Sequence, residues 1–323
     1  MDNENFAGVL DYFPEQIRDA SKLGKDIKCT PFKDILMCGM GGSGLPGEIV
    51  KSVVKDIPIT LVKSYTLPAF ANASLVFAVS FSGNTEETLL LYEQAKKRKL
   101  QVIVIASGGK LLEKAERDGT LHVKVPVPKA GKSGFQPRMA FALQTIPILN
   151  VLESQGVIKH IGWQRVARFI DDNKERIKQK AKELAQKIGN KIPLIYASEA
   201  FYVAALKWKV NCNENSKLHA FCNFFPEFNH HEINAFARPN GEYIVFILRD
   251  KDDHPRIKQR MDVFEDMMGE VISVESEGAD FISRLFWTIY LGDWVSYYAA
   301  INRGVDPTPI EIVEKFKKRL DGR

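Results

Sequence analysis

Hydroxyl-bearing side chains gather around a glycine in the segment SFSGNTEET, residues 80–88. The hydroxyl groups belong to Ser80, Ser82 and Thr85. Because an apolar run precedes the segment and helical spacing follows it, its amides are expected at a helix N-terminus, with Gly83 allowing a tight turn. Free amides and several hydroxyls suit a phosphate monoester. A well-capped helix, with Asn84 and Glu87 as a capping box, is the alternative interpretation.

A second glycine-rich segment, GMGGSG at residues 39–44, fits the G-x-G-x-x-G pattern of a turn that binds a dinucleotide. Such a site also needs an Asp or Glu about 20 residues later, at the end of the next strand, to hold the ribose. That strand is followed instead by Lys63 and Ser64, which argues against NAD and leaves only an NADP phosphate open to Lys63. The sequence therefore predicts no cofactor. Gly41 and Gly42 are expected either to approach another ligand or simply to form a tight turn.

Candidate proton-transfer groups lie in the second half of the chain. Glu214 stands in the polar segment NENSK and could act as a general base, or as a surface acid paired with Lys217. His230 and His231 precede Glu232, but HEINA lacks the second His of H-E-x-x-H, and no other His or Cys lies at ligand spacing. No metal site is therefore predicted.

Two further cationic positions attract attention. Arg138 precedes an expected helix, where it is either a ligand for negative charge or an ordinary surface cation. The segment TPIE predicts a helix start with Thr308 as N-cap, Pro at N1 and Glu at N3. Lys315 then lies about two turns after Thr308, on the same helix face, and Lys317 is the alternative lysine.

These residues need a framework of alternating strands and helices. Short apolar runs suit strands of a parallel sheet that are buried on both faces, at residues 34–39, 57–62, 74–80 and 101–106. After a long charged helix expected at 163–190, strands recur at 191–198, 242–249 and 270–276, with terminal helices at 279–301 and 308–320. The sequence predicts two doubly wound parallel-sheet α/β domains, residues 1–155 and 156–323.

GMGGSG followed by SFSGNTEET resembles the sugar isomerase (SIS) domain family, whose phosphosugar loop reads Ser-x-Ser-Gly-x-Thr. Four more motifs follow in order: PRMAF (137–141), NENSKLHAF (213–221), FPEFNHHEI (225–233) and VDPTPIEIVEKFKKRL (305–320). Nearly the whole chain thereby resembles the bifunctional phosphoglucose/phosphomannose isomerases of archaea and some bacteria. The resemblance implies flavodoxin-like SIS domains, hexose 6-phosphate substrates, and a metal-independent aldose–ketose isomerase without a cofactor.

The resemblance also implies a role for each candidate residue. The phosphate would be held by Ser80, Ser82 and Thr85, with the sugar beside Gly41, Gly42 and Ser43. Glu214 would move the proton through a cis-enediol, Arg138 would stabilise its charge, and His230 would open the sugar ring from the partner subunit of a homodimer. Thr308 and Lys315 would border the sugar.

Composition limits the classes of partner. The formal net charge of +5 is modest and the basic residues are scattered, which disfavours nucleic acid and is compatible with a small anionic substrate. The acidic N-terminus does not resemble a signal peptide, no membrane span is evident, and the four cysteines lack C-x-x-C spacing. A cytoplasmic protein is expected. The rival function is a phosphosugar sensor that binds without catalysis, although no basic recognition helix is evident.

Overall fold

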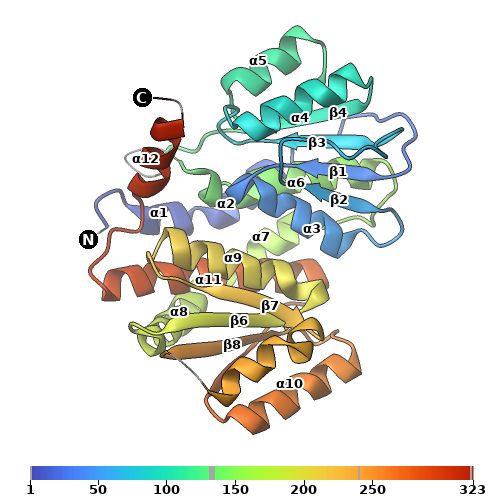
Figure 1. Cartoon of the computed structure of the whole chain (residues 1–323). Coiled ribbons are helices and arrows are strands. Elements are labelled where there is room, and N and C mark those ends of the chain that lie inside the picture. Colours follow the sequence, from blue (N-terminus) through green and yellow to red (C-terminus); the bar gives the residue numbers. More distant parts are fainter. Residues whose placement is uncertain (1, 131–134, 239–240, 321, 323) are drawn as a thin grey trace. The chain divides into compact units, whose positions relative to one another are not determined.

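The computed structural model describes residues 2–130, 135–238, 241–320 and 322, and it consists of two compact units (Figure 1). One unit is Asp11–Asp172, and the other joins Met1–Leu10 to Asn173–Arg323. The predicted boundary between residues 155 and 156 precedes α7 (Trp163–Asp172), whereas the compact units divide after this helix. Each unit contains its own parallel sheet, so the predicted fold class is confirmed.

The unit Asp11–Asp172 is built on a five-stranded parallel sheet in the order β2-β1-β3-β4-β5. Its strands are β1 (Ile35–Cys38), β2 (Ile59–Val62), β3 (Leu75–Val79), β4 (Gln101–Ala106) and β5 (Leu121–Lys124). β1 lies between β2 and β3, with Ile35 opposite both Ile59 and Leu75. β1 and β3 are buried along their whole length, which explains why continuous apolar runs predicted them. β5 was not predicted, because its sequence, LHVK, is not a continuous apolar run.

Helices cover both faces of this sheet. They are α2 (Phe13–Ala20), α3 (Leu45–Val53), α4 (Glu86–Lys97), α5 (Gly109–Arg117), α6 (Phe141–Ser154) and α7. Alternate strand residues such as Leu36 and Val104 share a core with Leu91 of α4 and Leu111 of α5. α3 and α6 pack against each other, and Figure 1 shows α4 and α5 together on one side of the sheet.

The second unit holds a four-stranded parallel sheet in the order β7-β6-β8-β9. Its strands are β6 (Ile192–Ser198), β7 (Phe221–Phe225), β8 (Tyr243–Arg249) and β9 (Val271–Glu275). Its helices are α8 (Lys174–Ile188), α9 (Tyr202–Glu214), α10 (Pro255–Met268), α11 (Phe281–Asn302) and α12 (Glu311–Leu320), while α1 (Phe6–Asp11) spans the division near the N-terminus. α8, α9 and α11 pack together, and α10 covers a core that includes Tyr196 and Phe264 (Figure 1).

Two predicted helices differ from the observed ones. The long charged helix expected at 163–190 is two helices, because Asn173 interrupts it with φ −103° and ψ 2° between α7 and α8. The last helix begins at Glu311 rather than Thr308, so the prediction that Thr308 is its N-cap is wrong. The main-chain oxygen of Ile310 instead accepts the first helical hydrogen bonds, from the N–H groups of Val313 and Glu314.

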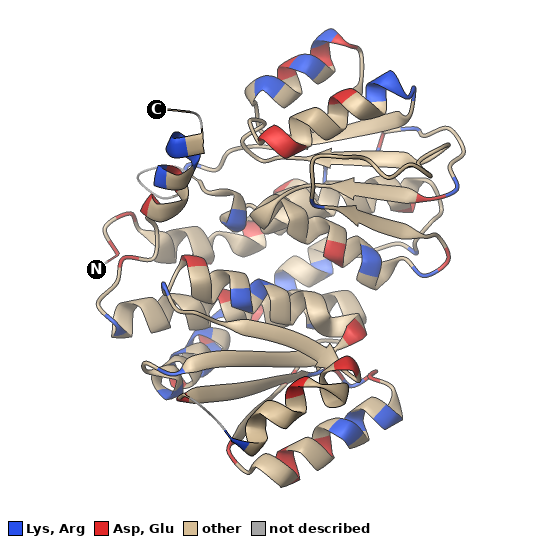
Figure 2. Cartoon of the chain, in the orientation of Figure 1, with Lys and Arg blue, Asp and Glu red and all other residues tan. Residues whose placement is uncertain are grey.

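Charged side chains are distributed as the sequence suggests. Figure 2 shows both signs interspersed along helices such as α5 and α10. None of the described helices has the length and apolar character needed to span a membrane.

Candidate active site

The hydroxyl-rich loop follows β3 and leads into α4. The Oγ of Ser80, which is buried, lies 3.0 Å from the Oγ1 of Thr85, while Ser82 is exposed. Gly83 has a φ of +67°, and a Cβ there would lie 1.8 Å from the main-chain oxygen of Gly108. Only glycine fits this position. The structure thus brings two of the three predicted hydroxyls into contact and leaves the third at the surface.

The N-terminus of α4 is not capped as predicted. Thr85 is the N-cap residue, and within the described residues no side chain caps this helix. The amide of Asn84 instead accepts the main-chain N–H of Lys110 at 3.2 Å. The predicted capping box of Asn84 and Glu87 is therefore wrong, because Asn84 joins this loop to the start of α5. Such an N-terminus, with its hydroxyls alongside, is suited to an anion.

The glycine turn after β1 lies against the hydroxyl loop. Its residues Gly41–Gly44 form a 3₁₀ turn, in which Gly41 has a φ of +53°. The buried hydroxyl of Ser43 donates to the Oε1 of Gln144 at 2.6 Å and accepts the main-chain N–H of Phe81 at 3.1 Å. Ser43 therefore joins the glycine turn, the hydroxyl loop and α6. Sequence reasoning missed Gln144, whose signal was a polar residue within the apolar stretch of α6.

Arg138 is carried by a second 3₁₀ turn, Pro137–Met139. A Cβ on Gly42 would lie 2.7 Å from the main-chain nitrogen of Arg138, so glycine allows the two turns to touch. The Arg138 side chain is buried rather than on the surface. Because α3 and α4 leave neighbouring strands β1 and β3 in opposite directions, these loops meet where doubly wound sheets bind ligands.

Lys63, the residue that could in principle face an NADP phosphate, forms an ion pair instead. Lys63 follows β2, and its Nζ lies 2.6 Å from the Oε1 of Glu48 on α3. The cation is therefore engaged within its own unit.

Buried polar contacts fix α9, the helix that ends at Glu214, against α11. The Nζ of Lys207 lies 2.6 Å from the Oδ1 of Asp293 and 2.7 Å from the Oδ1 of Asn211. At Asn215, the residue directly after α9, the Nδ2 donates to the Oγ of Ser296 at 2.9 Å. Contacts at this spacing set the rotation of α9 about its axis.

Glu214 is half-buried and lines a pocket of about 750 Å³. The segments 217–221 and 309–313 contribute to the same pocket. The Lys217 ammonium contacts the main-chain oxygen of Glu214 at 2.8 Å. The carboxylate thus stands at the C-terminal end of a fixed helix, beside an open pocket.

His230 is exposed at the end of a 3₁₀ turn, Glu227–His230, that follows β7 and the cis peptide bond before Pro226. Phe228, in the same turn, is fully buried, with its ring centroid 4.2 Å from that of Tyr196. The buried aromatic ring anchors the turn, and the imidazole remains accessible.

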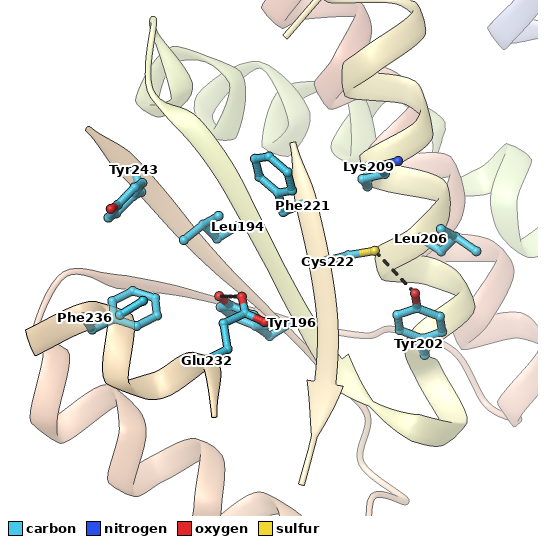
Figure 3. Close-up of a pocket in the computed structure, with 11 residues that line it drawn as sticks. Leu194, Tyr196, Tyr202, Leu206, Lys209, Phe221, Cys222, Glu232, Phe236 and Tyr243 are labelled. Atoms are coloured by element: carbon cyan, nitrogen blue, oxygen red, sulfur yellow. Dashed lines mark hydrogen bonds between the residues drawn. The ribbon is translucent and has the colours of Figure 1, made fainter. Parts of the chain in front are cut away.

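Glu232, next to the histidine pair, serves the fold. Its carboxylate accepts hydrogen bonds from the Tyr196 hydroxyl at 2.6 Å and the Asn223 Nδ2 at 2.7 Å. Burial, followed by the hydrogen bond to Glu232, raises the pKa of Tyr196 well above its ordinary value. Tyr196 and Glu232 line a pocket beside β7 (Figure 3), whose volume is about 500 Å³. Within the described parts of the chain, no three His, Cys, Asp or Glu side chains group to hold a metal ion.

Thr308 and Lys315 do not share a helix. Thr308 is buried, and its main-chain N–H donates to the Oδ1 of Asp306 at 3.0 Å. Lys315 is exposed on α12. Because residues 308–310 are not helical, helical spacing from Thr308 does not favour Lys315 over Lys317. The choice of lysine stays a prediction.

The strand order of the five-stranded sheet, together with the hydroxyl loop that follows β3, defines the class of sugar isomerase (SIS) domain proteins. Residues 32–146 match the SIS domain model, and residues 177–320 match the bacterial phospho-glucose isomerase C-terminal SIS domain.

Similar proteins define the family more closely. The chain is 36% identical over 309 residues to the bifunctional phosphoglucose/phosphomannose isomerase of Aquifex aeolicus, covering 92% of this chain and 93% of that protein. It is 37% identical over 332 residues to the protein of the same name from Caldicellulosiruptor bescii, covering 95% and 96%. The chain belongs to the family of bifunctional phosphoglucose/phosphomannose isomerases.

A solved structure supports the fold alone. The C-terminal domain of glucosamine-fructose-6-phosphate aminotransferase from Francisella tularensis superimposes with a TM-score of 0.73 at 14% identity, covering 94% of this chain and 98% of that one.

Proposed function

We propose that this protein interconverts glucose 6-phosphate, mannose 6-phosphate and fructose 6-phosphate. Membership of the bifunctional isomerase family supports hexose phosphates as the substrates. The single structural observation that carries the proposal is the Ser80–Thr85 hydroxyl pair at the N-terminus of α4, which no described side chain caps.

The phosphate binds at the start of α4. Its oxygens accept hydrogen bonds from the hydroxyls of Ser80, Ser82 and Thr85 and from main-chain amides of the helix N-terminus, whose dipole favours an anion. Gly41 and Gly42 allow the main chain to approach the sugar, and Ser43 holds this turn against the phosphate loop.

The reaction moves one proton between neighbouring carbons. Glu214 removes the proton from carbon 2 of the open-chain aldose, and the oxygen on carbon 1 takes up a proton, which gives a cis-enediol. The hydroxyl on carbon 2 then loses its proton while Glu214 returns its own proton to carbon 1, which gives the ketose. Arg138 stabilises the negative charge that develops on the enediolate oxygens. No redox cofactor is required, because the proton transfers leave the overall oxidation level of the sugar unchanged, and in the proposed mechanism Arg138 rather than a metal ion supplies the positive charge beside the enediolate.

Thr308 and Lys315 complete the sugar site. A small side chain at Thr308 leaves room for the intermediate to rotate about the bond between carbons 2 and 3. The proton then returns to either face of carbon 2, so the enzyme accepts both epimers.

His230 opens the sugar ring and comes from the partner subunit of a homodimer. Its exposure on an anchored turn supports this arrangement. The helix α12 also exposes a row of apolar side chains suited to a subunit interface, namely Ile312, Val313, Phe316 and Leu320. The proposed compartment is the cytoplasm, where thiols such as the four free cysteines stay reduced.

Assays of the purified protein with fructose 6-phosphate and with mannose 6-phosphate test the proposal. Conversion of both substrates is expected, and the rates should not change when EDTA is added. Binding of the sugars without conversion would favour a phosphosugar sensor. Loss of activity with EDTA would refute a metal-free mechanism.

A further inference from the structure

The chain turns sharply at Lys217, just after α9. Lys217 has a φ of +52°, in the left-handed region that side-chain-bearing residues rarely occupy. The turn is held by the main-chain N–H of Leu218, which donates to the Cys212 oxygen at 3.0 Å, and by the Asn213 Nδ2, which donates to the Leu218 oxygen at 2.8 Å. A strained residue that its neighbours hold in place is a reason to look for a function.

The ammonium of Lys217 contacts main-chain oxygens of two separate segments. The distances are 2.8 Å to Glu214, 3.3 Å to Asn215, 2.9 Å to Asp306 and 3.3 Å to Pro307. The first two oxygens lie at the C-terminal end of α9, where helical N–H partners run out and a cation is favourable. The other two belong to the loop before α12. We refer to these four contacts as the Lys217 bridge.

The bridge joins segments that both carry candidate active-site residues. On one side is the end of α9, which bears Glu214. On the other is the loop whose next residue, Thr308, is buried and bonded through its N–H to Asp306. We propose that Lys217 is a positioning residue, which fixes the Thr308 loop relative to the carboxylate of Glu214. This inference rests on the proposed isomerase function.

The bridge acts on the loop more than on α9. The helix is held independently, because Lys207 and Asn211 contact Asp293, and the Ser216 hydroxyl donates to the Ser296 oxygen at 2.7 Å. Loss of the ammonium therefore leaves α9 in place and frees the loop at Asp306 and Pro307. Small displacements of this kind lower the rate of a proton transfer much more than they lower binding at a separate phosphate group.

The experiment compares Lys217→Met and Lys217→Arg in the full-length protein. With fructose 6-phosphate, the methionine variant is expected to lose at least about tenfold in kcat, with KM within about twofold. It should also change the ratio of mannose 6-phosphate to glucose 6-phosphate formed, since the loop borders the space in which the intermediate rotates. The arginine variant, which keeps a cationic donor, should recover most of the rate. Lys187→Met, which removes an exposed lysine from the last turn of α8, is the matched control and should behave as wild type.

Hydrogen exchange reports on the bridge directly. Amides of 308–313 should exchange faster in Lys217→Met, while those of 205–212 in α9 keep their protection. An unchanged kcat and product ratio in Lys217→Met, unchanged exchange of 308–313, or an arginine variant as slow as the methionine variant would overturn the inference. If Lys217→Met does not fold, the same exchange and kinetic measurements are made on Lys217→Gln, whose side chain is too short to reach both segments. The same results then support or overturn the inference. An inactive wild-type protein would instead refute the proposed function.

Discussion

At the scale of single residues, Glu214 provides the sharpest test of the chemistry. Glu214→Gln keeps the shape of the side chain but removes the base, so isomerisation of both aldose phosphates should fall by at least about a thousandfold. Binding of fructose 6-phosphate should change little, because the phosphate is held elsewhere. Kinetics together with calorimetric titration separate the two effects, and a variant that still turns over would exclude Glu214 as the base.

Ser43 and Ser82 are both loop serines with different expected roles. Ser43→Ala leaves the Gln144 amide and the Phe81 N–H without their partner, so the free energy of unfolding should fall by about 1–3 kcal/mol. Ser82→Ala removes an exposed hydroxyl, and stability should stay within about 0.5 kcal/mol while KM for the phosphosugar rises. Denaturant unfolding and steady-state kinetics of the two variants test this contrast. Equal loss of stability in both would contradict it.

Residue types predicted the loops better than the contacts within them. The hydroxyl loop and the glycine turn were found from sequence, because their glycines and hydroxyls are local requirements. The caps at Asn84 and Thr308 were predicted wrongly, because remote groups decide them. The main-chain N–H of Lys110 engages Asn84, and the loop before Thr308 is held by Lys217 rather than by α12.

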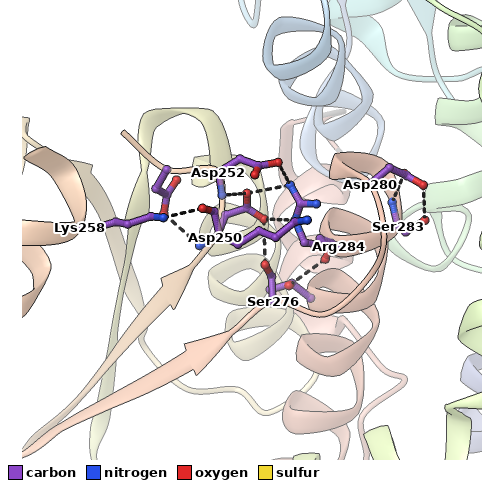
Figure 4. A network of polar contacts seen from close by, with 10 residues as sticks. Asp250, Asp252, Lys258, Ser276, Asp280, Ser283 and Arg284 are labelled. Atoms are coloured by element: carbon purple, nitrogen blue, oxygen red, sulfur yellow. Dashed lines mark hydrogen bonds and ion pairs between the residues drawn. The ribbon is translucent and has the colours of Figure 1, made fainter. Parts of the chain in front are cut away.

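At the scale of elements, α11 is tied to the end of β8 by a buried ion pair. The guanidinium of Arg284 lies 2.6 Å and 3.0 Å from the two carboxylate oxygens of Asp250, and Ser276 donates to the same carboxylate at 2.8 Å (Figure 4). Asp250→Asn leaves the buried cation poorly compensated and should lower the free energy of unfolding by about 3 kcal/mol. Asp252→Asn removes an exposed partner of the same Arg and should cost less than about 1 kcal/mol. Comparable losses in denaturant unfolding would contradict the assignment.

The same ion pair has a defined pH dependence. Burial alone would raise the pKa of Asp250, but the hydrogen bonds from Arg284, the Asp252 N–H and Ser276 outweigh it, so the pKa lies below its usual value. A carboxylate whose pKa is lower in the folded state than in the unfolded state stabilises the fold at pH values above its unfolded-state pKa of about 3.9. This contribution disappears as the pH falls through the folded-state pKa. The difference in stability between wild type and Asp250→Asn should therefore be constant near neutral pH and shrink below about pH 4.

The wholly buried strands were predicted from sequence, whereas the edge strands were predicted only in part. β1 and β3 are wholly buried and were found, whereas β7 lies at a sheet edge with Phe221 exposed and was missed. The break at Asn173 was also missed, because helical spacing continues on both sides of it. Apolar runs thus identified the inner strands and the edge strands β2 and β9, but not the edge strands β5 and β7 or the interruption at Asn173.

At the scale of the whole molecule, the proposed sharing of His230 between subunits has a direct test. Glu214→Gln and His230→Gln chains should each be inactive alone. In a mixed dimer, however, the intact Glu214 of one chain meets the intact His230 of the other at one of the two sites. Random exchange makes about half of the dimers mixed, so about a quarter of the sites should recover when equal amounts are unfolded and refolded together. If both residues acted within one chain, every site would keep one defect and no activity would return.

Phe316→Asp, which places a charge on the exposed apolar face of α12, should weaken the dimer and reduce this recovery.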